Sequence, residues 1–339
     1  MDLKPRIHRR DALGLAACGM LAAAGVARAD GKYKVNIVNT DSNSTRTLQA
    51  LLRNKGWLEE FGVEATTLNV SDGSKLMGAL ISGSSDICLL SGFGQVLVAI
   101  EKGAKVKVVG GASLLPSQAL FTKRPEIKTL KDLEGRTIGS GSIGALLHQI
   151  TSALLTKKGV DVSKVRFVNV GSSADVFRAV VAGVVDAGPA LSDVYDQRDK
   201  YGVHVPEGGK FWEELPEYTY QGSYASDRAI AGNREGLVRV LAAYGKMYRY
   251  ISGPNSLDDY VKARLEGVGG NHPEAAAEAT NEWRFVQRYQ PYATDLVLSQ
   301  ERISYMQGLN VQFDLQKSLT PYDKATDMSM ARDAIKLIN

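Results

Sequence analysis

The stretch Ala79-Leu-Ile-Ser-Gly-Ser-Ser-Asp86 recurs 100 residues later as Ala179-Val-Val-Ala-Gly-Val-Val-Asp186. In both copies an apolar helical pattern stops at a glycine, which can take the left-handed conformation that often ends a helix. The aspartate then stands in the turn that leads to the next strand pattern. We interpret both copies as a turn between a helix and a strand rather than as ligand contacts, and the repeat predicts a duplicated α/β unit.

Strand and helix patterns alternate on both sides of these two turns, which is typical of βαβ units on a mainly parallel sheet. Pro116 and Pro125 interrupt the alternation between the two copies. The predicted organisation is two α/β lobes joined by a hinge, with a ligand cleft between them. Lobe 1 comprises residues 30–115 and 222–339, and lobe 2 comprises residues 116–221. A return strand at 218–225 and a helix at 274–289 are expected to bring the chain back onto lobe 1.

The first 29 residues have the organisation of a bacterial export signal. A basic segment precedes an apolar stretch, and Ala27-Arg28-Ala29 suits cleavage before Asp30. Arg9-Arg10 partly resembles a twin-arginine signal, so the general and the twin-arginine routes both stay open. Because apolar sequence continues past Cys18, we expect release into the periplasm rather than attachment to lipid at that cysteine.

The composition of the remaining chain excludes several classes of protein. Removal of residues 1–29 takes away five Lys and Arg and two Asp and Glu, which lowers the formal net charge from +4 to +1. A nearly neutral surface argues against nucleic acid or an anionic membrane as the main partner, because both favour a basic patch. Cys88 is then the single cysteine, so no intrachain disulfide can form, and its apolar neighbours predict a core residue. We expect a monomer.

Several segments carry a resemblance to a known family. Lys55-Gly-Trp-Leu-Glu-Glu-Phe-Gly-Val-Glu64, the stretch 79–86 and Glu101-Lys-Gly103 resemble the first lobe of the nitrate/sulfonate/taurine-type periplasmic binding proteins. Residues 127–138 and 178–186 resemble the second lobe. The resemblance implies a type II periplasmic binding protein fold, the permease subunits of an ABC importer as partner, and neither a metal nor a redox cofactor. The family also includes receptors for thiamine-precursor pyrimidines and for aromatic acids, so it does not name the ligand.

The loops that follow the strands are the expected ligand site, because ligands of open α/β sheets bind beyond the carboxyl ends of the strands. These loops are rich in hydroxyl groups and glycine, and the helices that they open can hold an anion at their N-terminal N–H groups. Each Ser or Thr is also an ordinary helix N-cap, so the convergence of several loops on one cleft is what favours binding. The candidate ligand-binding residues are Asn39, Thr40, Asp41, Ser44, Ser91, Gly92, Phe93, Ser140, Ser142, Ile143, Gly171, Pro189, Leu191 and Tyr220.

Three features of these candidates bear on the ligand. Asp41 would repel a bare inorganic anion and would suit an amine or ring N–H on the ligand, or it caps the helix that follows. Phe93 and, more weakly, Tyr220 offer stacking surface for a ring or a carbon chain. Apart from Arg46 and Lys75 these loops carry no cation, so the sequence favours an organic ligand over nitrate.

The segment Gly139-Ser-Gly-Ser-Ile-Gly144 matches the dinucleotide-binding pattern and supports one rival interpretation, an exported NAD(P)-dependent oxidoreductase. The next strand ends at 168–171 without the acidic residue that would bind a ribose. His148, His204 and His272 lack the spacing of metal ligands. We therefore expect no enzyme, but an extracytoplasmic receptor that delivers a small organic anion or heterocycle, such as a sulfonate, a taurine-like compound or an aromatic acid, to an ABC importer. A sensory ligand-binding protein would share the same fold and site.

Overall fold

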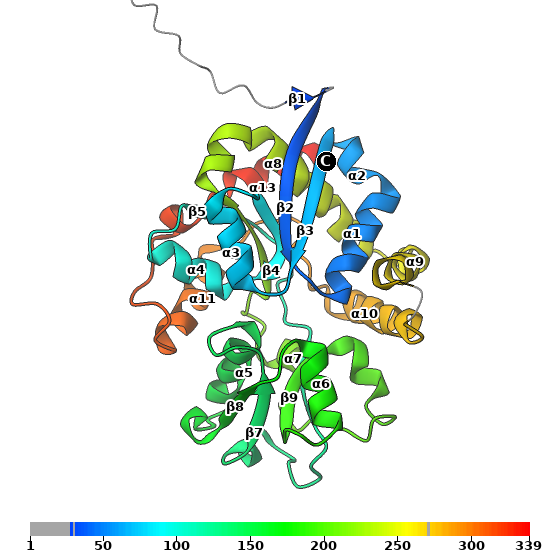
Figure 1. Cartoon of the computed structure of the whole chain (residues 1–339), viewed down its shortest axis with the longest axis vertical. Coiled ribbons are helices and arrows are strands. Elements are labelled where there is room, and N and C mark those ends of the chain that lie inside the picture. The colour runs from blue at the N-terminus through cyan, green and yellow to red at the C-terminus, as the bar shows by residue number, and fades with distance from the viewer. Residues whose placement is uncertain (1–27, 30, 270–271) are drawn as a thin grey trace, which may run out of the picture.

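Two β-sheets, one above the other in Figure 1, form the centre of the molecule. The structure is a computed structural model that describes residues 28–29, 31–269 and 272–339, so the predicted export signal lies outside the described residues except for its last two positions. The first sheet has six strands: β1 Arg28–Ala29, β2 Lys32–Thr40, β3 Val63–Val70, β4 Ile87–Gly92, β5 Val106–Gly111 and β10 Gln221–Ser226. The second has four: β6 Gln118–Thr122, β7 Thr137–Ser140, β8 Arg166–Asn169 and β9 Ala187–Leu191.

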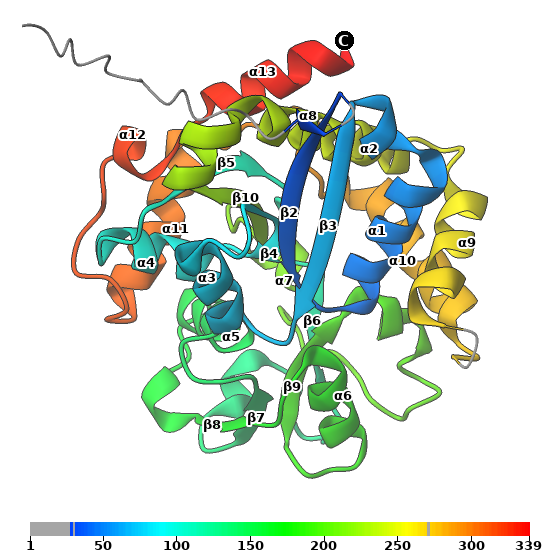
Figure 2. The same cartoon turned by 45° about the horizontal axis from the view of Figure 1, so that its top comes forward.

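Helices surround both sheets. Those before β10 are α1 Asn43–Lys55, α2 Trp57–Glu60, α3 Gly73–Ser82, α4 Gly94–Glu101, α5 Leu146–Lys157, α6 Ser173–Val181 and α7 Phe211–Glu214, with 3-10 turns η1 Leu130–Leu133, η2 Val162–Lys164 and η3 Ser192–Gln197. Those after it are α8 Asp227–Ser252, α9 Leu257–Val268, α10 Ala275–Tyr289, α11 Gln300–Gln312, α12 Tyr322–Ala325 and α13 Ser329–Ile338. Helices α8 and α13 cover the end of the molecule away from the second sheet (Figure 2).

The strand order shows how the chain passes between the sheets. The first sheet runs β1-β2-β4-β10-β5 with β3 beside β2, and the second runs β6-β9-β7-β8. Strand β10 follows the second sheet in sequence but pairs antiparallel with both β4 and β5. It is the predicted return strand, placed three residues later at its start than the sequence pattern suggested. The lobe boundaries at 115/116 and 221/222 stay a proposal.

The repeated motif performs the same task in both sheets. Gly83 and Gly183 have positive φ angles of 81° and 73°, the left-handed conformation that the sequence predicts. The carboxylate of Asp86 accepts a hydrogen bond from the backbone N–H of Asn36 at 2.8 Å, and that of Asp186 accepts one from Thr137 at 2.9 Å. Each aspartate therefore links its turn to the strand beside it, which confirms a structural role.

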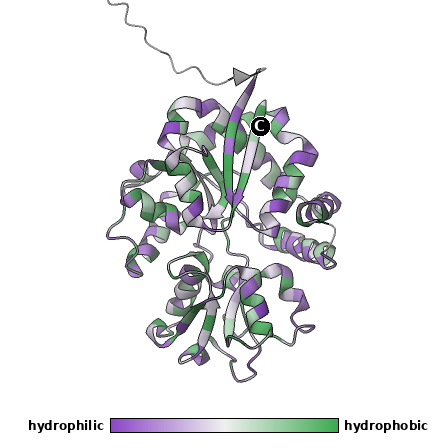
Figure 3. Cartoon of the chain, viewed as in Figure 1, coloured by the Kyte–Doolittle hydropathy of each residue, from purple (hydrophilic) through white to green (hydrophobic). Residues whose placement is uncertain are grey.

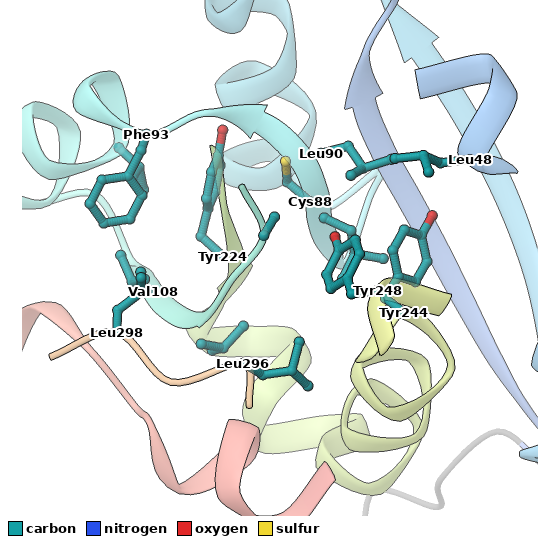
Figure 4. Close-up of a cluster of buried hydrophobic side chains, with 14 of the residues drawn as sticks. Leu48, Cys88, Leu90, Phe93, Val108, Tyr224, Tyr244, Tyr248, Leu296 and Leu298 are labelled. Atoms are coloured by element: carbon teal, nitrogen blue, oxygen red, sulfur yellow. The ribbon is translucent and has the colours of Figure 1, made fainter. Parts of the chain in front are cut away.

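Apolar residues concentrate on the interior strands and on the inward faces of the helices (Figure 3). The main buried cluster extends through the first sheet, α8 and the segment around Leu296 and Leu298, and Figure 4 shows part of it. Cys88 is fully buried there, as predicted, and burial raises the pKa of its thiol to about 12. The thiol is therefore a core group and not a nucleophile.

Helix α10 contacts both halves of the molecule. On one side, Trp283 Nε1 donates to Ser256 Oγ at 2.8 Å, next to the first sheet's helices. On the other, Phe285 belongs to the buried cluster of the second sheet, and its ring centroid lies 5.2 Å from that of Trp212. The prediction that the helix at 274–289 packs back on lobe 1 is therefore incomplete, because this helix also completes the core of the second sheet.

Candidate functional site

A cavity of about 1070 Å³ lies between the two sheets. The loops after β2, β4, β7, β8 and β9 contribute to its walls, together with residues next to β10 and residues of α10. Because the parallel strands of both sheets end at this cavity, their loops and the N-termini of the following helices face the same space. Strand-end loops from both sheets therefore converge as the sequence predicts.

Most of the candidate residues line this cavity. They are Thr40, Asp41, Ser44, Ser91, Gly92, Ser142, Gly171, Leu191 and Tyr220. Ile143 instead lines an adjoining cavity of about 450 Å³, of which Ser142 and Ala145 are shared walls. The contact of any of these residues with a ligand stays a proposal.

Four candidates do not line the cavity, because their side chains serve the protein interior. The Asn39 side-chain oxygen accepts hydrogen bonds from the backbone N–H groups of Leu89 and Leu90. Phe93 is fully buried in the core beside Tyr224, as Figure 4 shows. Ser140 and Pro189 are fixed in the second sheet, and the Ser140 hydroxyl donates to the backbone oxygen of Gly141 at 2.8 Å.

The start of α1 decides between the two roles considered for Asp41. Ser42 is the N-cap, since its Oγ accepts from the backbone N–H of Thr45 at 3.0 Å. Asp41 instead forms an ion pair with Arg46, whose Nε donates to Oδ1 at 2.7 Å. The capping role is thus wrong, and Asp41 lines the cavity with its charge already paired.

Two helix N-termini at the cavity have no side-chain cap. Helix α4 begins after Phe93 and α5 after Ala145, and neither N-cap residue provides a side-chain acceptor. A Cβ built on Gly94 would lie 2.5 Å from the side-chain oxygen of Gln149, so α4 and α5 approach each other closely. Free N–H groups at two adjacent helix N-termini can bind an anionic group.

The opposite wall contains a group of buried charges that the sequence analysis missed. We call Asp193, Glu278 and Glu282, all of which line the cavity, the acidic wall. Arg264 of α9 is fully buried behind it, forming an ion pair with Glu282 and lying 3.5 Å from Glu278. His272 Nε2 lies 2.9 Å from the Glu278 carboxylate. Glu278 and Glu282 are four residues apart on α10, a spacing at which two like charges destabilise a helix unless a cation lies near them. This spacing was the sign in the sequence that could have indicated a buried cation here.

Asp193 differs from the two glutamates. Its side chain follows β9 at the start of η3, is 8 % exposed, and has no Lys, Arg or His of the described chain within 4.0 Å. Burial and then the charge of Glu282 raise the pKa of its carboxyl group to about 7. Leu191 was a candidate from the sequence, whereas Asp193, two positions later, was not.

The comparisons with known proteins agree with this architecture. The sequence profile of the family described as NMT1/THI5 like matches residues 34–253, more than half of the chain. The chain belongs to the NMT1/THI5-like family. It is 21% identical over 329 residues to YtlA of Bacillus subtilis (strain 168), a protein named as a binding protein, and the match covers 94% of this chain and 96% of YtlA.

Two solved structures show the same fold. The periplasmic aliphatic sulphonate binding protein SsuA of Escherichia coli is 17% identical, with a TM-score of 0.70 over 87% of this chain and 92% of SsuA. The periplasmic nitrate-binding protein NrtA of Synechocystis PCC 6803 is 10% identical, with a TM-score of 0.70 over 90% of this chain and 89% of NrtA. The predicted periplasmic binding protein fold is confirmed. In the described part of the NMT1/THI5-like chain, none of the helices has the length and apolar character needed to cross a membrane.

Proposed function

We propose that the protein is an extracytoplasmic receptor that binds a small organic solute between its two sheets and delivers it to an ABC importer. The cavity walled by strand-end loops of both sheets is the observation that carries this proposal. The family, the fold and the relatives named as binding proteins support a substrate-binding receptor of the ABC import type. The predicted export signal and the periplasmic neighbours support a periplasmic location.

For the ligand, we propose a small organic molecule with an acidic group or a polar heterocycle. The uncapped N-termini of α4 and α5 suit a sulfonate or carboxylate, while Tyr220 and Tyr292 offer aromatic surface in the same cavity. Arg46 and Arg178 also line the cavity, but each forms an ion pair with its neighbour Asp41 or Asp175. This pairing supports an organic ligand over a bare inorganic anion.

A thermal-shift screen of the purified protein tests the proposal. The compounds are alkyl and aromatic sulfonates, taurine, nitrate, aromatic carboxylates, pyrimidines and nicotinamide dinucleotides. Binding to the native state at a hundredfold excess over Kd adds about 2.7 kcal/mol of stability, which corresponds to a rise of several degrees in Tm. We expect such a rise with one organic class. A rise with dinucleotides alone would contradict the receptor function.

A pair of substitutions locates the binding event. Ser142→Trp places an indole at the wall shared by the two cavities and is expected to weaken binding at least about tenfold, which is 1.4 kcal/mol. Ser84→Trp is the matched control, since Ser84 is an exposed serine in the turn before β4 and does not line the cavity. Equal affinity of both variants for the ligand would show that binding occurs elsewhere.

The topology of the second sheet does not support an oxidoreductase. Its three parallel strands run in the order β8-β7-β9. Strand β7, which leads into the glycine-rich segment, therefore lies in the middle of these three strands. Dinucleotide-binding halves place their three strands in the order 3-2-1 instead. Gly141 and Ser142 of that segment line the proposed solute cavity, so the segment has a role without a dinucleotide.

A further inference from the structure

The acidic wall holds more negative than positive charge. Asp193, Glu278 and Glu282 face the cavity, and Arg264 is the cation that contacts this group. His272 adds a hydrogen bond to Glu278, and the Ser44 hydroxyl donates to Glu282 at 2.6 Å. Two carboxylates thus share one guanidinium, and a third is left over.

The leftover carboxylate is Asp193, and its surroundings favour a positive charge from outside the protein. Its side chain is more than nine-tenths buried, and the backbone N–H of Val194 is the hydrogen-bond donor that its carboxylate has. A buried carboxylate without a cation is costly, so a protein normally pairs it or keeps it protonated. In the ligand-free protein the second solution applies in part, since burial and Glu282 raise the pKa of Asp193 to about 7 and both protonation states are populated near neutral pH.

No other cation in the described cavity wall is available to Asp193. Arg46 and Arg178 contact Asp41 and Asp175 respectively. Arg264 forms its ion pairs with the two glutamates of α10 and donates through Nε to Thr47 Oγ1 at 2.6 Å. Within the described residues, no group of three or more His, Cys, Asp or Glu side chains is arranged to hold a metal ion.

We propose that the ligand carries a cationic nitrogen, an ammonium or amidinium group, which binds to Asp193 with Glu282 beside it. This inference rests on the proposed receptor function and names the chemistry of the ligand's polar end. An ammonium group supplies the missing charge and donates hydrogen bonds to both carboxylates, which makes each bond stronger than a neutral one. Tyr220 and Tyr292 line the same cavity and provide aromatic surface for such a cation.

The acidic wall and the uncapped helix N-termini are on different sides of the molecule. Helices α4 and α5 lie on the left of the view in Figure 1, whereas α10 lies on the right. A molecule with a cationic group at one end and an acidic or polar group at the other would therefore satisfy both walls. Such a ligand would place its acidic group at the helix N-termini, away from the carboxylates of Asp193, Glu278 and Glu282.

Calorimetric titration with matched compounds tests this inference. The compounds form two pairs that differ mainly in an amino group: 3-aminopropanesulfonate against propanesulfonate, and benzylamine against benzyl alcohol. We expect the amine of at least one pair to bind at least about tenfold more tightly than its partner. In Asp193→Asn this preference is expected to fall to about threefold or less, while Asp196→Asn, an exposed aspartate of the same 3-10 turn, keeps it.

The pH dependence provides a second readout. Protonated Asp193 cannot attract a cation, so the affinity of the wild type for the amine should rise between pH 6 and pH 8. The charged groups that face Asp193 are Glu278, Glu282, Arg264 and His272, and all of them remain in Asp193→Asn, which should lose most of the rise.

Three outcomes would overturn the inference: tighter binding of both amine-free partners, no binding of either amine, or equal affinity of wild type and Asp193→Asn for the amine. If an amine-free compound binds and Ser142→Trp abolishes its binding, the receptor function is supported, but the proposal that the ligand carries a cationic group is wrong. If a compound binds equally well to wild type and Ser142→Trp, the proposal that ligands bind in this cavity is wrong.

Discussion

The two walls of the cavity are built by different means. One wall consists of loops rich in hydroxyl groups and glycine, each placed at the end of a strand, together with the first turns of the following helices. Its arginines, Arg46 and Arg178, form ion pairs with aspartates three to five residues earlier in the chain. The acidic wall combines residues that are far apart in sequence, namely Asp193 after β9 and two glutamates of α10, around the buried Arg264. The first wall follows from local sequence and the second from packing between distant helices. This difference predicts how much each wall contributes to stability and to binding.

The largest effect is expected from the buried guanidinium. Arg264→Met leaves Glu278 and Glu282 without their cation, which should lower the free energy of unfolding by about 3–5 kcal/mol at neutral pH. Arg284→Met is the control, because Arg284 is exposed on α10 and should change stability by about 0.5 kcal/mol or less. Denaturant unfolding of both variants measures the difference. Equal stability of the two would mean that the acidic wall does not depend on Arg264.

A somewhat smaller effect is expected from Asp193, and it depends on pH. The pKa of this carboxyl group is about 7 in the folded protein and near 4 when unfolded, so the folded state holds the proton more tightly. Its contribution to stability is therefore complete below about pH 4 and is lost as the pH rises to about 7.

The loss amounts to at most about 4 kcal/mol, and Asp193→Asn should not show it. Thermal unfolding at pH 5 and pH 8 measures this, with Asp196→Asn as control. The stability of Asp193→Asn relative to wild type should be higher at pH 8 than at pH 5. If the stability difference between Asp193→Asn and wild type were the same at pH 5 and pH 8, ionisation of Asp193 would not affect the stability of the folded protein.

The smallest effect is expected at Tyr220, which lines the cavity directly before β10. Gln118 is fully buried, and its Nε2 donates to the Tyr220 hydroxyl at 2.6 Å. Tyr220→Phe leaves this amide without its acceptor, which should cost about 1–3 kcal/mol of stability. The measurement is denaturant unfolding, and Tyr289→Phe is a suitable control because ring contacts, and no hydrogen bond of its hydroxyl, are found among the described residues. If Tyr220→Phe lost as much stability as Arg264→Met, the expectation that the buried ion pairs of the acidic wall contribute more to stability than this hydrogen bond would be contradicted.

The same contrast explains what the sequence could reveal. The 100-residue repeat of Ala79–Asp86 correctly predicts two sheets, because left-handed glycines and turn aspartates are local signals. Residues at the carboxyl ends of strands, such as Thr40 of β2 and Ser91 of β4, reach the cavity for the same reason. Asn39 and Phe93 do not, since a shift of one position along a strand or helix start turns a side chain into the core.

The acidic wall could not be predicted from the sequence, because its residues come together only in the folded protein. Glu278 lies 85 residues after Asp193 in the chain, and α10 contacts both sheets' cores rather than one. The periodicity of α10 predicts which face is apolar, but not that its two glutamates face a cavity. The like-charge spacing of Glu278 and Glu282 was the one local sign that a cation lies between them.

Hydrogen–deuterium exchange of the purified protein, with and without the ligand found by the screen, tests most directly whether a solute binds between the sheets. Bound ligand is expected to slow exchange in the strand-end loops of both sheets, at residues 41–46, 91–95, 141–147 and 191–194, and in the first turns of α10. Protection that extends over both sheets, including Asp193, would support the receptor function and the acidic wall together. Protection confined to one sheet, or located away from these loops, would contradict a solute held between them.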